Sequence, residues 1–446
     1  KIYIQLFTAL IFAVHPIQTQ SVTYIIQRME SLSGLFYLGS LIFYFLARVK
    51  KRKILYFSLF SISSLLAVLT KQTSFSLPLS ILLLEIFFIR DKDNVVNKKV
   101  VYSIIGLLSL TTVIMIATDT LPRETYEISR FEYLISQFIV IPKYIFMSFI
   151  PIGQNLDHDI LIPETVFSIK IFGGMLLILG LLIFAVFFSK KNKIISFSVL
   201  WFFALLALRS SILPIGDLMY EHRLYMSLFG YGFFLGVLVF FISDKFKLHR
   251  ISKYLPIIIL GLITLSYSIA TFQRNKVWKT DISLWGDVVK KSPDKFRPNY
   301  NTAEALKRNG YLDKALNFYL KAYKLDSNSY GTCNNIGNIY YEKKDIEEAK
   351  KFYGLAIEIN PNYSKTLNNL ANIYFTEKNY TEAETYYLQA IKINEKYIDA
   401  LFNLGNLYYF TGRNQEALES YLKVISIQPD HRLASENYKK LKKAMN

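Results

Sequence analysis

The feature that most constrains this fold is a 34-residue period in the last third of the chain. An alanine series and a tyrosine series both keep that period through four units. The series are Ala315, Ala349, Ala383 and Ala417, and Tyr319, Tyr353, Tyr387 and Tyr421. Small residues at a fixed period let two helices cross closely in every unit. The pattern therefore predicts stacked pairs of helices rather than one globular core.

A period of 34 residues with this distribution of small and aromatic residues is typical of the tetratricopeptide repeat (TPR). Pro361 and Pro429 end two of the units. We predict four TPR repeats over residues 296–430, followed by a capping helix over 431–446 that covers the exposed apolar end.

Two asparagine series follow the same period on the first helix of each predicted repeat. Because they stand three residues apart, they share one helix face. The first is Asn301, Asn335, Asn369 and Asn403, and the second is Asn338, Asn372 and Asn406. Such an array on a concave face could hydrogen-bond an extended peptide, so we predict protein or peptide binding there. The alternative is that asparagine is simply common at these positions.

The first 272 residues have a different composition. The whole chain is 52% hydrophobic and 16% aromatic, with a mean hydropathy of +0.25. Up to residue 272 apolar runs alternate with short charged loops, which predicts a polytopic membrane domain of about nine helices. The runs are 1–14, 32–47, 54–70, 74–89, 100–117, 167–188, 194–208, 224–243 and 254–272. We predict that residues 273–295 form a juxtamembrane joint. The predicted fold class is all-α, a membrane domain followed by a TPR solenoid.

Basic loops predict the orientation in the lipid bilayer. The net charge is +18, but much of the excess lies in short loops beside apolar runs, which is typical of the cytoplasmic side and argues against nucleic acid as a partner. The loops are 48–53, 90–99, 189–193 and 243–253. All four can be cytoplasmic only if residues 131–150 form an interfacial helix that does not cross. The TPR repeats then lie on the extracytoplasmic side, whether periplasmic, extracellular or lumenal.

Polar stretches that this orientation places outside supply the candidate site. Residues 17–30 are expected to form an amphipathic interfacial helix. Carboxylates in two other stretches could act as a general base or contact sugar, acceptor or metal, and cations could hold a lipid phosphate. The tentative catalytic residues are Asp157, Asp159 and Glu221, and the phosphate-binding candidates are His15, Arg28, Lys71, His158, His222 and Arg223. Taken singly, each could merely end a helix or solvate the interface. No spacing matches a metal motif, so a divalent metal cofactor is left open.

Several of these stretches together resemble a known family. They are HPIQTQSVTYIIQRMESLSGLFYL, LLAVLTKQTSFSLPLSILLLE, IGQNLDHD, DLMYEHRLYMSLFG and RNKVWKTDISLWGDVVKKSP followed by the repeats. They resemble the tetratricopeptide-bearing transmembrane O-mannosyltransferase-like family, which is similar to GT-C membrane glycosyltransferases. The resemblance implies sugar transfer from a polyprenyl-phosphate donor to an acceptor on the extracytoplasmic face, with the repeats recruiting a protein acceptor.

The resemblance also implies that an acidic residue of the first extracytoplasmic loop acts as the base. We expect that loop to lie upstream of Lys1, because the sequence resembles the family only from a later helix onward. A non-catalytic, membrane-anchored TPR scaffold is the main alternative, although ten or so helices exceed what an anchor needs. A transporter is a weaker alternative, because no inverted repeat is evident.

Overall fold

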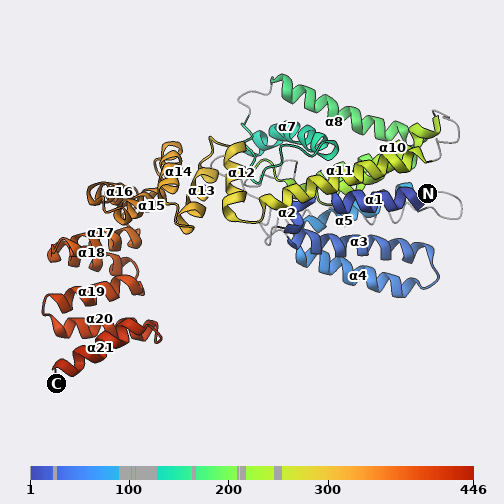
Figure 1. The fold of residues 1–446 in the computed structure, drawn as a ribbon. Helices are drawn as coiled ribbons and strands as arrows, with labels where there is room; N and C mark the ends of the chain where they lie inside the picture. Colours follow the sequence, from blue (N-terminus) through green and yellow to red (C-terminus); the bar gives the residue numbers. More distant parts are fainter. Residues whose placement is uncertain are drawn as a thin grey trace. The chain divides into compact units, whose positions relative to one another are not determined.

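The computed structural model describes residues 2–23, 28–89, 128–162, 167–207, 217–245 and 254–445, together with residues 102, 106 and 210. Throughout these residues every regular element is a helix (Figure 1), which confirms the predicted all-α class. The chain divides into two compact units, 1–291 and 292–446, and each is described by itself.

The first unit combines long apolar helices with short polar ones. Four of its described helices, α3, α4, α8 and α11, are long and apolar enough to cross a membrane. Its elements are α1 (Ile2–Val14), α2 (Gln18–Thr23), α3 (Arg28–Val49), α4 (Lys53–Thr70), η2 (Gln72–Ser76), α5 (Leu77–Phe87), α7 (Arg130–Phe149), α8 (Ile169–Phe188), α9 (Lys193–Ala207), η3 (Glu221–Leu224), α10 (Ser227–Lys245), α11 (Leu255–Val277) and α12 (Asp281–Lys291). Shorter apolar helices lie within α1, α5, α9 and α10.

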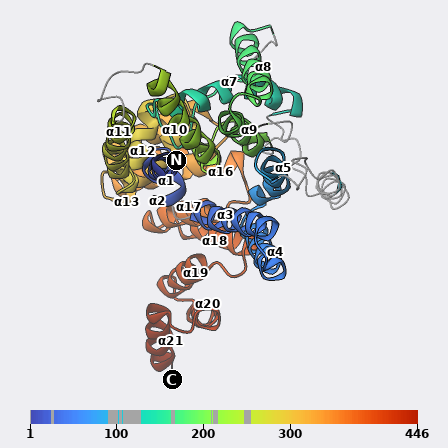
Figure 2. The same cartoon turned by 90° about the vertical axis from the view of Figure 1, so that its right-hand side faces the viewer.

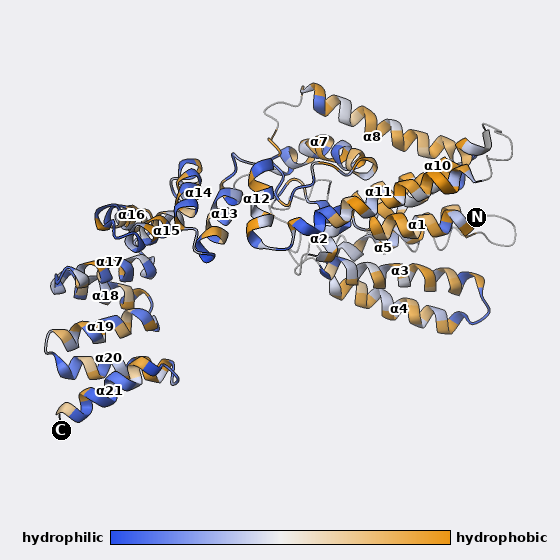
Figure 3. Cartoon of the chain, viewed as in Figure 1, coloured by the Kyte–Doolittle hydropathy of each residue, from blue (hydrophilic) through white to orange (hydrophobic). Residues whose placement is uncertain are grey.

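The helices of the first unit bury the side chains with which they contact one another, and many of their apolar side chains point outward. Figures 1 and 2 show α3 beside α4, and α1 packs against α10 and α11. Only 6% of the α4 span and 22% of the α8 span is buried, although both are strongly apolar (Figure 3). An apolar surface of this kind suits hydrocarbon rather than water as its solvent.

The predicted interfacial helix over 17–30 differs from the structure. Helix α2 ends at Thr23, residues 24–27 lie outside the described part, and Arg28 already begins the apolar helix α3. The side chains from Gln18 to Ser21 are buried, and two of them bond other elements: Gln18 Nε2 donates to the Tyr225 carbonyl, and Gln20 Oε1 accepts the His222 amide. Residues 18–21 therefore pack inside the unit, whereas Val22, Arg28 and Met29 are exposed.

The structure bears on only some of the other membrane predictions. The run 131–150 forms α7, which is not among the four candidate spans and carries Pro142 in its interior. The run 100–117, the basic loop 90–99 and most of the loop 243–253 lie outside the described residues. The orientation that these loops imply thus stays a prediction.

Helix α12, from the predicted joint, is bound to the first unit by charged contacts. Asp287 Oδ2 lies 2.6 Å from Arg274 Nη1 on α11 and 2.7 Å from Lys291 Nζ. Lys291 Nζ also donates to the Gln154 carbonyl at 2.6 Å. The segment after α11 is therefore anchored to the loop 151–159.

The second unit is a stack of helix pairs. The pairs form four repeats, and a last helix follows them. They are α13 (Phe296–Arg308) with α14 (Leu312–Leu325), α15 (Tyr330–Glu342) with α16 (Ile346–Ile359), α17 (Ser364–Thr376) with α18 (Tyr380–Ile393), α19 (Ile398–Phe410) with α20 (Asn414–Ile427), and the single helix α21 (Arg432–Met445). The periodic small residues permit close helix crossing: a Cβ added at Gly337 would lie 2.6 Å from the Tyr353 ring.

Candidate functional site

The short helix η3 is the junction of the candidate site in the first unit. Its Glu221, His222 and Arg223 are 3, 7 and 5% exposed, although all three are polar or charged. Burial of such groups requires partners, and η3 obtains them on two sides. Glu221 binds the loop 151–159, whereas His222 and Arg223 line a pocket beside α3.

Glu221 ends a chain of polar contacts. Its Oε1 lies 3.0 Å from His158 Nε2 and also accepts the backbone N–H of Asn155. His158 Nδ1 lies 3.4 Å from Lys143 Nζ. A lysine ammonium can only donate, so His158 accepts at Nδ1 and donates from Nε2 to the Glu221 carboxylate. Burial lowers the pKa of Lys143, and the charges of Glu221 and Asp159 oppose that shift.

The structure places the three predicted catalytic residues differently. Glu221 contacts His158, a predicted phosphate-binding residue, whereas Asp159 is exposed. Asp157 is buried, and its backbone is held by Asn155, whose Nδ2 donates to the Asp157 carbonyl at 2.9 Å. Among the described residues no three His, Cys, Asp or Glu side chains converge as metal ligands.

Arg223 is held by the segment just before η3. Its Nη1 donates to Tyr133 Oη at 2.9 Å and to the Leu218 carbonyl at 3.1 Å, and its Nη2 donates to the Asp217 carbonyl at 2.8 Å. The guanidinium also lies over the Tyr220 ring, 5.1 Å from its centre. These contacts orient the side chain, so its charge is presented in one fixed direction.

A polar pocket lies between α3, η2, α9 and η3. Its empty volume is about 370 Å³, with the open mouth included. Glu30, on α3, is almost fully buried and pairs at 2.6 Å with Lys71 Nζ at the end of α4. The pocket is thus lined by a carboxylate, His222 and Arg223, and Lys71 pairs with that carboxylate without being one of the lining residues. The lining residues are Glu30, Ser33, Tyr37, Thr73, Ser76, Leu205, His222, Arg223, Tyr225 and Met226.

Three larger polar members of this pocket, Glu30, Tyr37 and Tyr225, were not among the predicted site residues. Glu30 lies in the polar stretch that supplied Arg28, and a carboxylate beside an apolar helix is an available signal. Tyr37 and Tyr225 carry no such signal, because tyrosine is common along these apolar runs. Only packing reveals that Tyr37 Oη contacts Ser80 Oγ at 2.6 Å.

Of the predicted phosphate-binding residues, His222 and Arg223 line the pocket, whereas His15, Arg28, Lys71 and His158 do not. His15 is fully buried; its Nε2 donates to the Ser148 carbonyl at 2.9 Å and its Nδ1 accepts the Ile17 amide at 3.3 Å. Desolvation lowers the pKa of His15 to about 4, so the ring is neutral near pH 7 and holds α1 to α7. Arg28 is exposed, and its Nε donates to the Val22 carbonyl at 3.3 Å.

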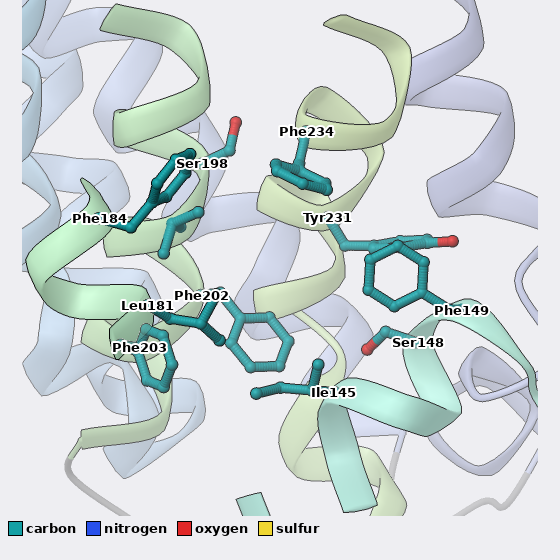
Figure 4. A pocket seen from close by; sticks show the side chains of 11 residues that line it. Ile145, Ser148, Phe149, Leu181, Phe184, Ser198, Phe202, Phe203, Tyr231 and Phe234 are labelled. Carbon is teal, nitrogen blue, oxygen red and sulfur yellow. The ribbon is translucent and has the colours of Figure 1, made fainter. Parts of the chain in front are cut away.

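A second pocket is entirely apolar along its accessible lining. It lies between α7, α8, α9 and α10, with an empty volume of about 580 Å³ including its mouth. Figure 4 shows the rings of Phe202, Tyr231 and Phe234 surrounding the space. A cavity of this chemistry suits a hydrocarbon chain and offers nothing to a sugar or a phosphate.

In the second unit, the first asparagine series joins neighbouring repeats. Each amide nitrogen donates to an acceptor on the first helix of the preceding repeat. The bonds run from Asn335 to Glu304, from Asn369 to Asn338 and from Asn403 to Asn372, at 2.8, 2.8 and 3.0 Å. Asn437 in α21 continues the series by donating to Asn406 at 3.3 Å. Helix α21 therefore occupies the place of a fifth first helix, whereas Asn301 makes no such bond among the described residues.

The second asparagine series receives those bonds, and each of its side chains also receives a tyrosine hydroxyl from its own repeat. Tyr353 Oη donates to Asn338 Oδ1 at 2.7 Å, and Tyr421 Oη donates to Asn406 Oδ1 at 2.8 Å. Each of these carbonyl oxygens is thus used within the stack, while the amide nitrogen has no partner among the described residues. We call the two series together the asparagine ladder: Asn335, Asn369, Asn403, Asn338, Asn372 and Asn406.

Comparisons with known proteins agree with both units. Residues 332–396 and 362–430 match a family model described as tetratricopeptide repeat, and residues 296–329 match a second model of that description. The protein O-mannosyl-transferase TMTC3 of Homo sapiens is 24% identical over 374 residues, covering 74% of this chain and 40% of that protein. The protein O-mannosyl-transferase F38B6.6 of Caenorhabditis elegans is 24% identical over 325 residues, covering 71% of this chain and 45% of that protein.

The family resemblance predicted from the sequence is therefore confirmed, and so is the TPR solenoid. The chain spans about two fifths of the length of the human relative. Among solved structures, the crystal structure of MamA is 20% identical, with a TM-score of 0.31, over 33% of this chain and 86% of that one.

Proposed function

We propose that this chain is the membrane-embedded and acceptor-recruiting part of a glycosyltransferase that uses a polyprenyl-phosphate sugar and acts on the extracytoplasmic face. The observation that carries the proposal is the polar pocket lined by Glu30, His222 and Arg223 beside candidate membrane-spanning helices, with Lys71 paired to Glu30. The similarity to proteins named O-mannosyl-transferases supports the same class of reaction.

Each pocket group has a role that follows from its chemistry. Lys71 and Arg223 carry the positive charge that neutralises a phosphate as it leaves the sugar. In place of the upstream loop acid that the family resemblance implies, Glu30 accepts the proton of the attacking hydroxyl group, while the bond from the sugar to the phosphate breaks. The hydrocarbon tail of the donor occupies the apolar pocket of Figure 4. A metal is not needed for these roles, and a divalent ion remains an optional addition.

The asparagine ladder supports recruitment of the protein acceptor. In the second, third and fourth repeats the first amide, such as Asn369, keeps its oxygen available because both N–H groups donate internally. The second amide, such as Asn372, keeps its N–H groups available because its oxygen accepts internally. One acceptor and one donor per repeat complement the C=O and N–H of an extended peptide backbone. The half-exposed positions of these side chains permit such contact.

The test is transfer of a labelled sugar from a polyprenyl-phosphate donor to a peptide acceptor by the protein in membranes. We expect Glu30→Gln and Lys71→Met each to lower the transfer rate at least about tenfold, since each removes a charged group used in the transition state. Lys51→Met, an exposed change in a basic loop, is the matched control. Unchanged transfer by both pocket variants would contradict the proposed site.

A non-catalytic scaffold is the second candidate, and the available amide groups of the ladder favour it as well. It predicts that pocket variants retain the cellular role while ladder variants lose it. Exposure of the repeats on intact cells, measured by labelling of introduced surface cysteines, tests the proposed extracytoplasmic location of the second unit.

A further inference from the structure

The first rung of the ladder differs from the others in charge. Glu304 on α13 occupies the position that Asn338, Asn372 and Asn406 occupy in later repeats. Its Oε1 accepts the Tyr319 hydroxyl group and Asn335 Nδ2. An ionised carboxylate can only accept, so chemistry alone sets the direction of both bonds at this rung.

The second oxygen of Glu304 has no partner among the described residues, and the side chain is half-exposed. In later repeats the equivalent atom is an amide nitrogen, which can only donate. Along Glu304, Asn338, Asn372 and Asn406, the group without an internal partner is therefore a negatively charged acceptor on α13 and an N–H donor in the later repeats. Lys307 and Arg308 follow three and four residues further along α13, and Arg308 is exposed.

We propose that the concave face selects an extended peptide that carries a lysine or arginine at the Glu304 end. The amides along Asn338, Asn372 and Asn406 contact backbone groups and are indifferent to sequence, whereas Glu304 requires a donor and favours a positive charge. This inference rests on the proposed recruitment of a peptide acceptor. It also fixes the direction in which the peptide binds, because a basic residue at the other end of the peptide would meet asparagine instead of a carboxylate.

The test measures binding to the full chain in detergent. The probes are labelled alanine–serine peptides with blocked termini that carry lysine at the first position, at the last position or at neither. We expect one of the two lysine peptides to bind about tenfold more tightly than the neutral peptide, the gain of a charge-assisted hydrogen bond. In Glu304→Gln this preference disappears, while Gln keeps one oxygen for the two internal bonds. Glu358→Gln removes the same charge from an exposed site on α16 and retains the preference.

The outcomes separate this inference from the proposed recruitment. Equal binding of all three peptides overturns the role of Glu304 and leaves peptide recruitment standing. A lysine preference that survives in Glu304→Gln also overturns it. Absence of binding by every peptide overturns both. A preference that weakens at high salt as well as in Glu304→Gln supports the electrostatic origin.

Discussion

The substitution Asn372→Asp distinguishes the internal hydrogen bonds of a ladder amide from its proposed contact with a peptide. The Asn372 oxygen accepts the Tyr387 hydroxyl at 2.5 Å and Asn403 Nδ2 at 3.0 Å, while its nitrogen is available to a peptide. Aspartate keeps an oxygen in the inward position and replaces the outward N–H donor with an acceptor. We therefore expect the repeats to remain folded while peptide binding weakens.

The magnitudes follow from the bonds that each variant removes. Asn372→Asp keeps both internal bonds and should cost less than about 1 kcal/mol, whereas Asn372→Ala leaves two buried donors unsatisfied and should cost about 2–4 kcal/mol. Loss of the outward donor, with repulsion between two acceptors, should weaken peptide binding by about 1–2 kcal/mol, or about 5- to 30-fold.

Hydrogen exchange of the α17 and α18 amides measures local stability in the full chain, and fluorescence anisotropy with the neutral alanine–serine peptide measures affinity. The reasoning fails if Asn372→Asp binds the peptide as tightly as the unchanged protein. It also fails if Asn372→Asp loses as much amide protection as Asn372→Ala, because the inward oxygen would then not be the group that stabilises the stack.

Two further predictions concern the first unit. A Cβ at Gly174 on α8 would lie 1.8 Å from the Phe138 carbonyl oxygen, so Gly174→Ala should destabilise the α7–α8 contact by at least about 1–3 kcal/mol. A Cβ at Gly180 meets nothing within 4 Å, so the control Gly180→Ala should be neutral. Equal effects of the two variants on thermal unfolding in detergent would contradict this packing. Burial lowers the pKa of His15 from 6.5 to about 4. The contribution of the neutral His15 ring to the free energy of unfolding is therefore fully present above pH 6.5 and is lost as the pH falls through about 4. That loss amounts to about 3 kcal/mol and should be absent in His15→Gln, and parallel pH profiles of thermal unfolding for the two proteins would refute it.

The 34-residue period predicted some features of the repeats and not others. The 34-residue spacing predicted the helix pairs and the shared face of the asparagines. It did not predict which amide atom faces the groove, because that choice depends on bonds to residues about 15 and 31 positions away. Glu304 stands in register with the second series, but asparagine at the other three positions of that series predicts no carboxylate there.

The candidate site illustrates the complementary case. Polar stretches of the sequence indicated His222 and Arg223, which line one pocket, and Lys71, which pairs with the lining residue Glu30. The same reasoning could not separate His15, which packs as a neutral ring, from a residue that binds phosphate. Burial and partner geometry decide such roles, and neither is encoded in spacing along the chain.

The class of the protein could thus be predicted from the amino-acid order: apolar helices with polar interruptions, then a periodic helical stack. Hydrophobic runs and repeat periods are local properties, and they act through solvent exclusion and close helix crossing. Which polar groups share a pocket, and which hydrogen-bonding atoms remain available, became visible only in the folded chain. Those properties depend on contacts between distant segments, such as Glu30 with Lys71 and Glu304 with Asn335.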